Sequence, residues 1–220
     1  TLEGELTDYP TLIYDGPFSE HIENAESEML KSAPEVSAEE AYKKAREFIG
    51  DKAEGLEYEA DMTNTAIESY VFSKSADNEQ IAVSVTKKGG YILYFINSRV
   101  VRESNYDKDS ATAVAHKYLT EHGFTDMSSS YYEITDNIAT INFAYEKDGI
   151  KMYSDLIKVR VALDTGEIVG VECKGYLMNH KDRGNLHAVM SEEEARTKVS
   201  SHLSVGTGKL ALIPKDSLRE

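Results

Sequence analysis

The residues of this 220-residue chain that could do chemistry are its histidines, its acidic pairs and its single cysteine. The six histidines contain no His-Glu-x-x-His pair, the spacing that places two zinc ligands on one helical face. His180, Asp182 and His187 are close enough in sequence to share a metal ion, but they fall in the polar stretch NHKDRGNLH. A solvated linker is the better interpretation of that stretch. We therefore predict no metal site and no cofactor.

Signals for a nucleophile or an acid–base pair are equally weak. Cys173 ends an alternating apolar run with no histidine near it in sequence, which favours a buried strand residue over a reactive thiol. The acids at 39–40 and 192–194 open predicted helices, where the helix dipole favours negative charge. No Gly-x-Ser-x-Gly motif occurs, and SVGTGK at 204–209 lacks the first glycine and the Ser or Thr of a phosphate-binding loop. We predict that the chain is not an enzyme.

The charge of the chain excludes two further classes of function. Lys and Arg number 24 against 39 Asp and Glu, so the formal net charge is −15. A surface this acidic argues against binding to nucleic acid and against docking on anionic lipid. Residues 1–36 hold nine acids and one base, which concentrates the acidity in an N-terminal leader. We expect both ends to be cut from a longer protein, with any membrane anchor upstream of Thr1.

Three segments that share one helical pattern are the elements that would position these residues. They open with the capping side chains Ser37, Asp107 and Ser191. Small residues then follow at a spacing of four, which is typical of a helix packed closely on a sheet. These small residues are Ala41 and Ala45, Ala111 and Ala115, and Ala195 and Val199.

After each of the first two helices the hydrophobic period changes from 3.6 to 2, which predicts antiparallel strands joined by glycine-containing turns such as 87–90 and 148–149. Each unit would hold about four strands. The strand-like runs are 56–62, 70–72, 81–85 and 91–96, then 131–134, 138–145, 152–163 and 167–176. The third helix is followed by one strand-like run, at 209–214.

We therefore predict an α+β chain of tandem units, each with one helix packed on a roughly four-stranded antiparallel sheet. Residues 1–36 form an acidic leader that packs on the first repeat. Residues 37–106 and 107–190 form the first and second repeats, and 191–220 a truncated third. This last segment is expected to be poorly ordered, to lean on the second repeat, or to self-associate with another copy.

The repeat pattern resembles the PepSY domain, on the helix motif S-x-E-E-A-x-x-x-A-x-x-F-I and a T-G-E-I hairpin at 165–168. The sequence of the leader makes the resemblance more specific, to one family of proteins that contain PepSY domains. Its sequence YPTLIYDGPFSEHI, at residues 9–22, together with the tandem units resembles the YpeB family of spore germination proteins along essentially the whole chain.

The family resemblance implies a function in protein contact. It implies a non-enzymatic partner that binds, stabilises or inhibits the cortex-lytic hydrolase SleB in the dormant spore. The protein would lie at the outer face of the spore inner membrane, next to the peptidoglycan cortex, and would reach the membrane only through an N-terminal segment outside this sequence. PepSY domains also occur in propeptides, so an alternative is an inhibitor of a peptidase. The other alternative is peptidoglycan hydrolysis by the chain itself.

The leader supplies the candidate partner-binding residues. They form a short apolar run closed by a turn, which could equally pack as an edge strand on the first repeat. The acidity of the leader would also speed encounter with a basic partner. The candidates are Tyr9, Pro10, Tyr14, Asp15, Gly16 and Pro17.

Overall fold

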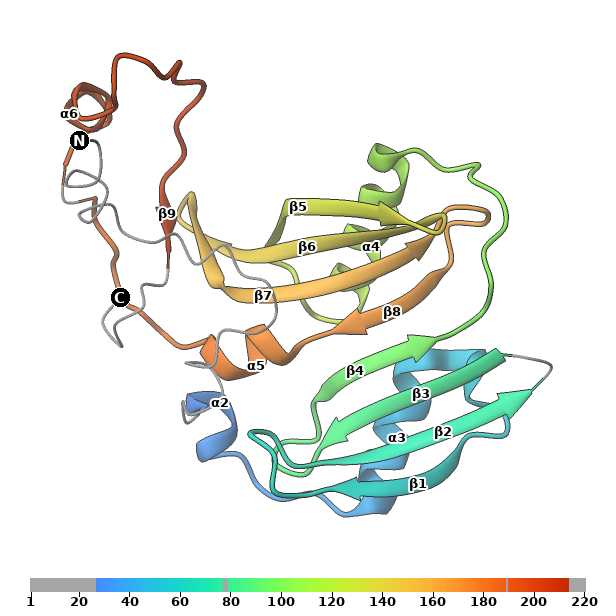
Figure 1. Ribbon diagram of the computed structural model, residues 1–220. Coiled ribbons are helices and arrows are strands. Elements are labelled where there is room, and N and C mark those ends of the chain that lie inside the picture. Colours follow the sequence, from blue (N-terminus) through green and yellow to red (C-terminus); the bar gives the residue numbers. More distant parts are fainter. Residues whose placement is uncertain (1–26, 77–78, 189, 214–220) are drawn as a thin grey trace, which may run out of the picture.

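One long antiparallel sheet with helices on one face dominates the computed structural model, which describes residues 27–76, 79–188 and 190–213 (Figure 1). The strand order is β1-β2-β3-β4-β8-β7-β6-β5, and the short strand β9 pairs with β7. Helices α3 and α4 lie behind the two halves of this sheet (Figure 1). The predicted α+β class of helix-on-antiparallel-sheet units is confirmed. Within the described residues, no helix is long and apolar enough to cross a membrane.

The first unit folds as its local sequence predicts. Ser37 caps α3 reciprocally: its backbone N–H donates to the Glu40 carboxylate over 2.8 Å, and the Glu40 N–H donates to the Ser37 hydroxyl over 3.2 Å. Ala41 and Ala45 have no exposed surface, because the helix packs directly on the sheet. The elements are α3 (Ala38–Ile49), a 3-10 turn η1 (Gly50–Ala53), β1 (Glu57–Met62), β2 (Ser69–Ala76), β3 (Glu79–Thr86) and β4 (Ile92–Asn97).

The second unit repeats this design. The Asp107 carboxylate accepts the Ser110 N–H over 2.8 Å at the start of α4, and Ala111 and Ala115 are fully buried against the sheet. Gly149 closes a hairpin with a φ of 76°, a backbone conformation that glycine adopts without strain. The elements are α4 (Lys108–Glu121), β5 (Met127–Thr135), β6 (Ile138–Lys147), β7 (Ile150–Ala162) and β8 (Ile168–Glu172).

Two predicted element boundaries are wrong on the C-terminal side. The strand expected over 167–176 ends at Glu172, and residues 174–179 form helix α5 (Lys174–Asn179). Its Leu177 and Met178 are buried, and a Cβ added at Gly175 would lie 3.0 Å from the Leu156 carbonyl oxygen. Close packing on β7 therefore overrides the strand-like pattern.

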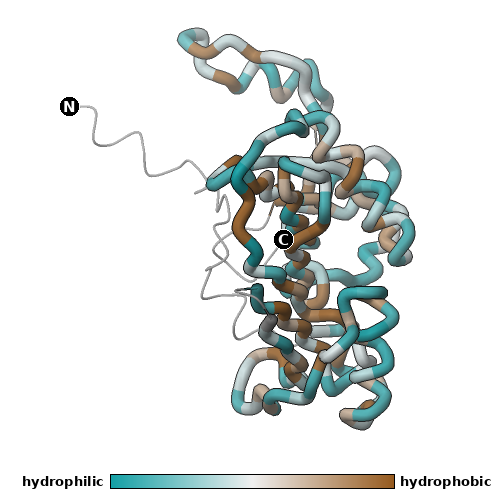
Figure 2. The backbone as a smooth tube through the Cα atoms, turned by 90° about the vertical axis from the view of Figure 1, so that its right-hand side faces the viewer, coloured by the Kyte–Doolittle hydropathy of each residue, from teal (hydrophilic) through white to brown (hydrophobic). Residues whose placement is uncertain are grey.

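The third predicted helix is also shorter than its pattern suggests. Helix α6 (Glu192–Thr197) begins at the Ser191 cap but ends before Val199, which is 38% exposed. Among the described residues no sheet buries the small residues of this helix, and short helices without such packing are marginal in water. Figures 1 and 2 show this segment projecting beyond the body of the molecule.

The described part of 191–220 leans on the second unit through β9 (Ala211–Leu212). This strand pairs in parallel with the start of β7, Lys151 with Ala211 and Met152 with Leu212. Leaning on the second repeat was one of the three outcomes expected for this segment. The division of the chain at 36/37, 106/107 and 190/191 itself stays a prediction.

Only the last part of the leader, residues 27–36, is described. Its short helix α2 (Glu28–Lys31) lies against α5, and the Ser27 hydroxyl donates to the Leu177 carbonyl. The Val36 N–H donates to the Lys87 carbonyl of the β3–β4 turn over 2.8 Å. This part of the leader therefore contacts both units, where the sequence suggested the first alone.

Candidate functional site at the junction of the two units

The two units join where the last strand of each pairs with the last strand of the other. Strands β4 and β8 run antiparallel, with Phe95 opposite Val171 and Ile96 opposite Gly170. Phe95 and Val171 are 2% and 3% exposed and belong to one apolar core that runs through both units. Because this pairing covers one edge of each sheet, it removes two open strand edges and makes one continuous sheet.

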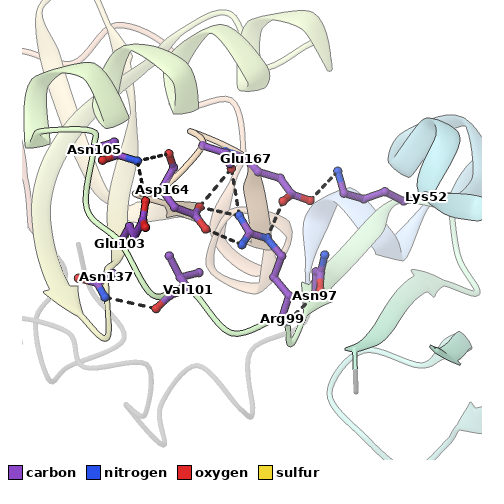
Figure 3. A network of polar contacts seen from close by, with 10 residues as sticks. Lys52, Asn97, Arg99, Val101, Glu103, Asn105, Asn137, Asp164 and Glu167 are labelled. Carbon is purple, nitrogen blue, oxygen red and sulfur yellow. Dashed lines mark hydrogen bonds and ion pairs between the residues drawn. The ribbon is translucent and has the colours of Figure 1, made fainter. Parts of the chain in front are cut away.

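A group of ion pairs, here called the arginine clamp, closes one end of the junction (Figure 3). Arg99 follows β4, and its two terminal nitrogens donate to the two carboxylate oxygens of Asp164 over 2.9 and 2.7 Å. Its Nε donates to Glu167 over 2.6 Å, and the other Glu167 oxygen lies 3.0 Å from Lys52 Nζ. Asp164 and Glu167 belong to the β7–β8 hairpin, so the clamp ties η1 and the exit of β4 to the second unit.

The electrostatics of the clamp follow from this bidentate contact. The hydrogen bonds that Arg99 donates lower the pKa of Asp164 to about 2. The same bonds raise the pKa of the Arg99 guanidinium. The side chains of Arg99 and Asp164 are each 19% exposed, so water screens the pair only in part. Arg99 and Asp164 are therefore both ionised at neutral pH.

The segment between the units is also bound along the second unit. The backbone N–H groups of Asn105 and Tyr106 both donate to the Leu163 carbonyl, over 2.7 and 2.8 Å. The Tyr106 ring lies over Gly166, where an added Cβ would be 2.7 Å from it. Because Gly166 also has a φ of 75°, the hairpin needs glycine at this position.

A buried carboxylate lies on the second unit near α5. Asp155 has no exposed surface and accepts hydrogen bonds from both terminal nitrogens of Arg183 at 2.9 Å. His180 Nδ1 lies 2.9 Å from the same carboxylate, and the Ser154 hydroxyl donates to it over 2.6 Å. Burial alone would raise the pKa of Asp155, but the hydrogen bonds from His180, Arg183 and Ser154 outweigh it and lower the pKa.

This cluster corrects in part the interpretation of NHKDRGNLH as a solvated linker: Lys181, Asp182 and His187 are exposed as predicted, but His180 and Arg183 are not free in solvent. His180 and Arg183 are anchored to Asp155, and the Arg183 side chain is only 4% exposed. The structure brings His180 to Asp155, not to Asp182 or His187. Within the described ranges, no group of three acidic, histidine or cysteine side chains gathers in a way that could hold a metal ion.

The other residues singled out from the sequence have different outcomes. Cys173 is fully buried as predicted, but it lies at the start of α5, and burial raises the pKa of its thiol to about 12. The partner-binding candidates Tyr9, Pro10, Tyr14, Asp15, Gly16 and Pro17 lie outside the described residues.

Sequence reasoning missed the charged residues of the arginine clamp and of the Asp155 cluster. Asp155 could have been identified from the sequence, because it alternates with Ile157, Val159 and Val161 on the same face of β7. All three of these residues are fully buried. An acid on the buried face of a strand requires a partner. Arg99 carried no such signal, since its partners lie more than 60 residues away.

An apolar cavity of about 590 Å³ lies where the third segment meets the second unit. It is an open pocket, lined by the start of β7, by β9 and by α6 with the residues around it. Its lining includes Ile150, Met190, Ala195, Val199, Leu210 and Leu212. Ala195 and Val199, the small residues predicted to pack on a sheet, therefore line this pocket.

Residues 1–186 match the family model described as YpeB sporulation, PepSY1 and PepSY2 domains. The chain belongs to the YpeB sporulation family. The matched range holds both units, the arginine clamp and the Asp155 cluster, so the whole junction lies within the YpeB region.

Relatives and a solved structure agree with this assignment. The chain is 34% identical over 134 residues to a sporulation protein YpeB of Halalkalibacterium halodurans, covering 61% of this chain and 30% of that protein. The YpeB protein of Oceanobacillus iheyensis is 30% identical over 189 residues, covering 84% and 42%. The chain thus spans less than half the length of these relatives. The Bacillus megaterium YpeB C-terminal domain superposes with a TM-score of 0.74 at 27% identity, over 83% of this chain and 82% of that one.

Proposed function

We propose that this YpeB-family chain is a non-enzymatic spore protein that binds a SleB-like cortex-lytic hydrolase and stabilises or inhibits it in the dormant spore. The family match over residues 1–186 carries the proposal, because it spans the leader and both units. The protein acts at the outer face of the spore inner membrane, next to the cortex, and is held there by an N-terminal segment outside this sequence.

The joined sheet is suited to contact with another protein. Because the clamp and the β4–β8 pairing hold two units together, a partner meets one preformed surface and loses little conformational entropy on binding. The two outer strands of the sheet expose aromatic side chains, which are enriched at protein interfaces. Tyr58 on β1 is 55% exposed, and Tyr131 and Tyr132 on β5 are 47% and 44% exposed.

The acidic leader gives the proposed contact a charge dependence. Nine acids against one base in residues 1–36 would attract a basic partner over long range, mainly by raising the association rate. Binding should therefore associate more slowly at about 0.5 M salt than at about 0.05 M, where screening is weaker. An association rate that is insensitive to salt would contradict steering by the leader.

A digestion assay on purified spore cortex tests the proposed activity. Muropeptide release would be followed with the hydrolase alone, with this chain alone, and with both together. We expect no release by this chain alone, and either slower release or longer survival of the hydrolase in the mixture. Release by this chain alone would show a peptidoglycan hydrolase instead. Inhibition of a peptidase, without any effect on the cortex hydrolase, would favour a propeptide-like inhibitor.

The leader residues can be tested in the same assay. Tyr14→Ala and Asp15→Ala should weaken the effect on the hydrolase without lowering the melting temperature, and Thr11→Ala serves as the neighbouring control. If both variants lose stability and binding in equal proportion, the leader packs on the protein and does not contact the partner.

A further inference from the structure

The outer strand β5 leaves one edge of the long sheet open. It ends the strand order opposite β1, and no strand of the described chain pairs with its outer side (Figure 1). An edge strand directs alternate backbone N–H and C=O groups outward, so the nine residues of β5 offer a template for another strand. Natural proteins either protect such an edge or cover it with a partner strand.

The two outer strands of the sheet differ in this protection. β1 carries three acids among six residues, Glu57, Glu59 and Asp61, so two copies of β1 would repel each other. β5 carries one acid among nine residues, Glu133, and contains neither Lys nor Pro, the residues that commonly blunt an edge. Of the two outer edges, β5 is therefore the one that can accept a second copy of itself.

Apolar side chains of β5 are exposed beside this edge. After a bulge, residues 131–135 pair with β6 in regular register. Within this stretch Tyr132 and Ile134 lie opposite Ile141 and Ala139, which are buried in the core beneath α4. Tyr132 and Ile134 are nevertheless 44% and 47% exposed. A strand added at β5 would extend this face of the sheet and cover both side chains.

The junction between the two units shows what such a pairing looks like. The strand order places the fourth strand of each unit at the junction and the first strand of each unit outside. Because β4 and β8 run antiparallel with both helices on one face, an approximate two-fold axis normal to the sheet relates the units (Figure 1). This pairing leaves Phe95 and Val171 only 2% and 3% exposed. An exact two-fold axis at β5 would repeat the arrangement between two molecules, since an antiparallel edge is complementary to itself.

We propose that two copies of this chain pair through β5, antiparallel about a two-fold axis at Tyr132, so that one sheet runs through the dimer. In this register Tyr132 faces Tyr132 of the second copy, an aromatic cross-strand pair. Glu133 faces Tyr131 of the second copy, so the two acids are not directly opposite. The pairing uses neither β1 nor the third segment. It also requires no hydrolase, so it is measured independently of the proposed function.

Sedimentation of the purified chain tests the dimer. A salt concentration of about 0.5 M screens the repulsion between two acidic copies. The wild type should shift from monomer to dimer as its concentration rises. Ile134→Lys puts a charge into the paired edge and should raise the dissociation constant at least about tenfold. Met62→Lys, at a 44% exposed position of β1, is the matched control and should behave as the wild type.

An introduced cysteine locates the axis. The native Cys173 is fully buried, so it does not compete for oxidation. Tyr132→Cys would face its own copy across the axis at a Cα separation of about 4.5–5.5 Å, which a disulfide spans. Mild oxidation should therefore link two chains of Tyr132→Cys, and much faster than two chains of Met62→Cys.

Three results would overturn the proposal. The first is a wild-type chain that stays monomeric up to about 200 μM, a measurement that needs no variant. The second is a dimer that persists in Ile134→Lys but is lost in Leu203→Asp, because Leu203 lies on the third segment and is 66% exposed. The third is cross-linking of Tyr132→Cys that is no faster than that of Met62→Cys.

Discussion

Arg99 and Asp164 join the two PepSY units through a bidentate contact, with both carboxylate oxygens accepting from the guanidinium over 2.7 and 2.9 Å. Arg99 comes from the end of the first unit and Asp164 from the last hairpin of the second. The pair fixes how the two units meet, because a planar guanidinium binds a planar carboxylate in one orientation.

Replacing the guanidinium should weaken the junction without unfolding the chain. Arg99→Gln should lower the free energy of unfolding by about 1 kcal/mol, because the pair is partly exposed and screened. Arg99→Lys should recover only part of this loss, since an ammonium cannot form the bidentate contact. Urea unfolding measures both variants.

The matched control for the clamp is an exposed pair on α3. Lys43 and Glu39 are 67% and 81% exposed, so Lys43→Gln should cost only about 0.3 kcal/mol. If Arg99→Gln costs no more than Lys43→Gln, the clamp is an ordinary surface ion pair and does not hold the units together.

The buried carboxylate should be far more sensitive. Asp155→Ala leaves Arg183 and His180 without their shared acceptor in a buried site, so the free energy of unfolding should fall by about 3–5 kcal/mol. The control is Asp182→Ala, two residues after His180 but with an 86% exposed side chain, which should cost less than about 1 kcal/mol. Equal effects of the two substitutions in chemical denaturation would contradict the structure.

Acid should destabilise the chain through the same carboxylates. The pKa of Asp164 is lowered to about 2, and that of Asp155 is lowered as well, so both groups contribute stability at neutral pH. The contribution of Asp164 should be lost as the pH falls from about 4, near the unfolded value, to about 2. Arg99→Gln should remove this part of the acid dependence. An unchanged pH profile in that variant would show that another group is responsible.

The small residues on the helices set how closely each helix approaches the sheet. Ala115 on α4 is fully buried, so Ala115→Leu should lower the free energy of unfolding by about 1–3 kcal/mol through overpacking. Ala113 on the same helix is exposed, and Ala113→Leu should change stability by less than about 0.5 kcal/mol. Thermal unfolding that ranks the two variants in the opposite order would mean that the helix faces are assigned wrongly.

The helices and most strands were predictable because their signals are local. The cap at Ser37 and the alanines at 41 and 45 act within one helix, so spacing alone locates them. The pairing of β4 with β8 was not predictable in this way, since it joins Phe95 to Val171, far apart in sequence. Residues 174–176 were predicted to continue a strand, but packing on β7 makes them the start of helix α5.

The Asp155 cluster shows the same limit for charged side chains. Arg183 lies in a stretch whose polar composition suggests solvent, and only its contact with Asp155, 28 residues earlier, reveals a buried cluster. In the local sequence, the position of Asp155 on the buried face of its strand was what indicated that this carboxylate needs a partner.

The central claim is that this YpeB-family chain binds a SleB-like hydrolase, and titration of one purified protein into the other by calorimetry tests it most directly. We predict saturable binding at a fixed stoichiometry, retained in Lys43→Gln and weakened in Arg99→Gln if a partner contacts both units. Absence of binding by the folded wild-type chain, at both low and moderate salt, would contradict the proposed function.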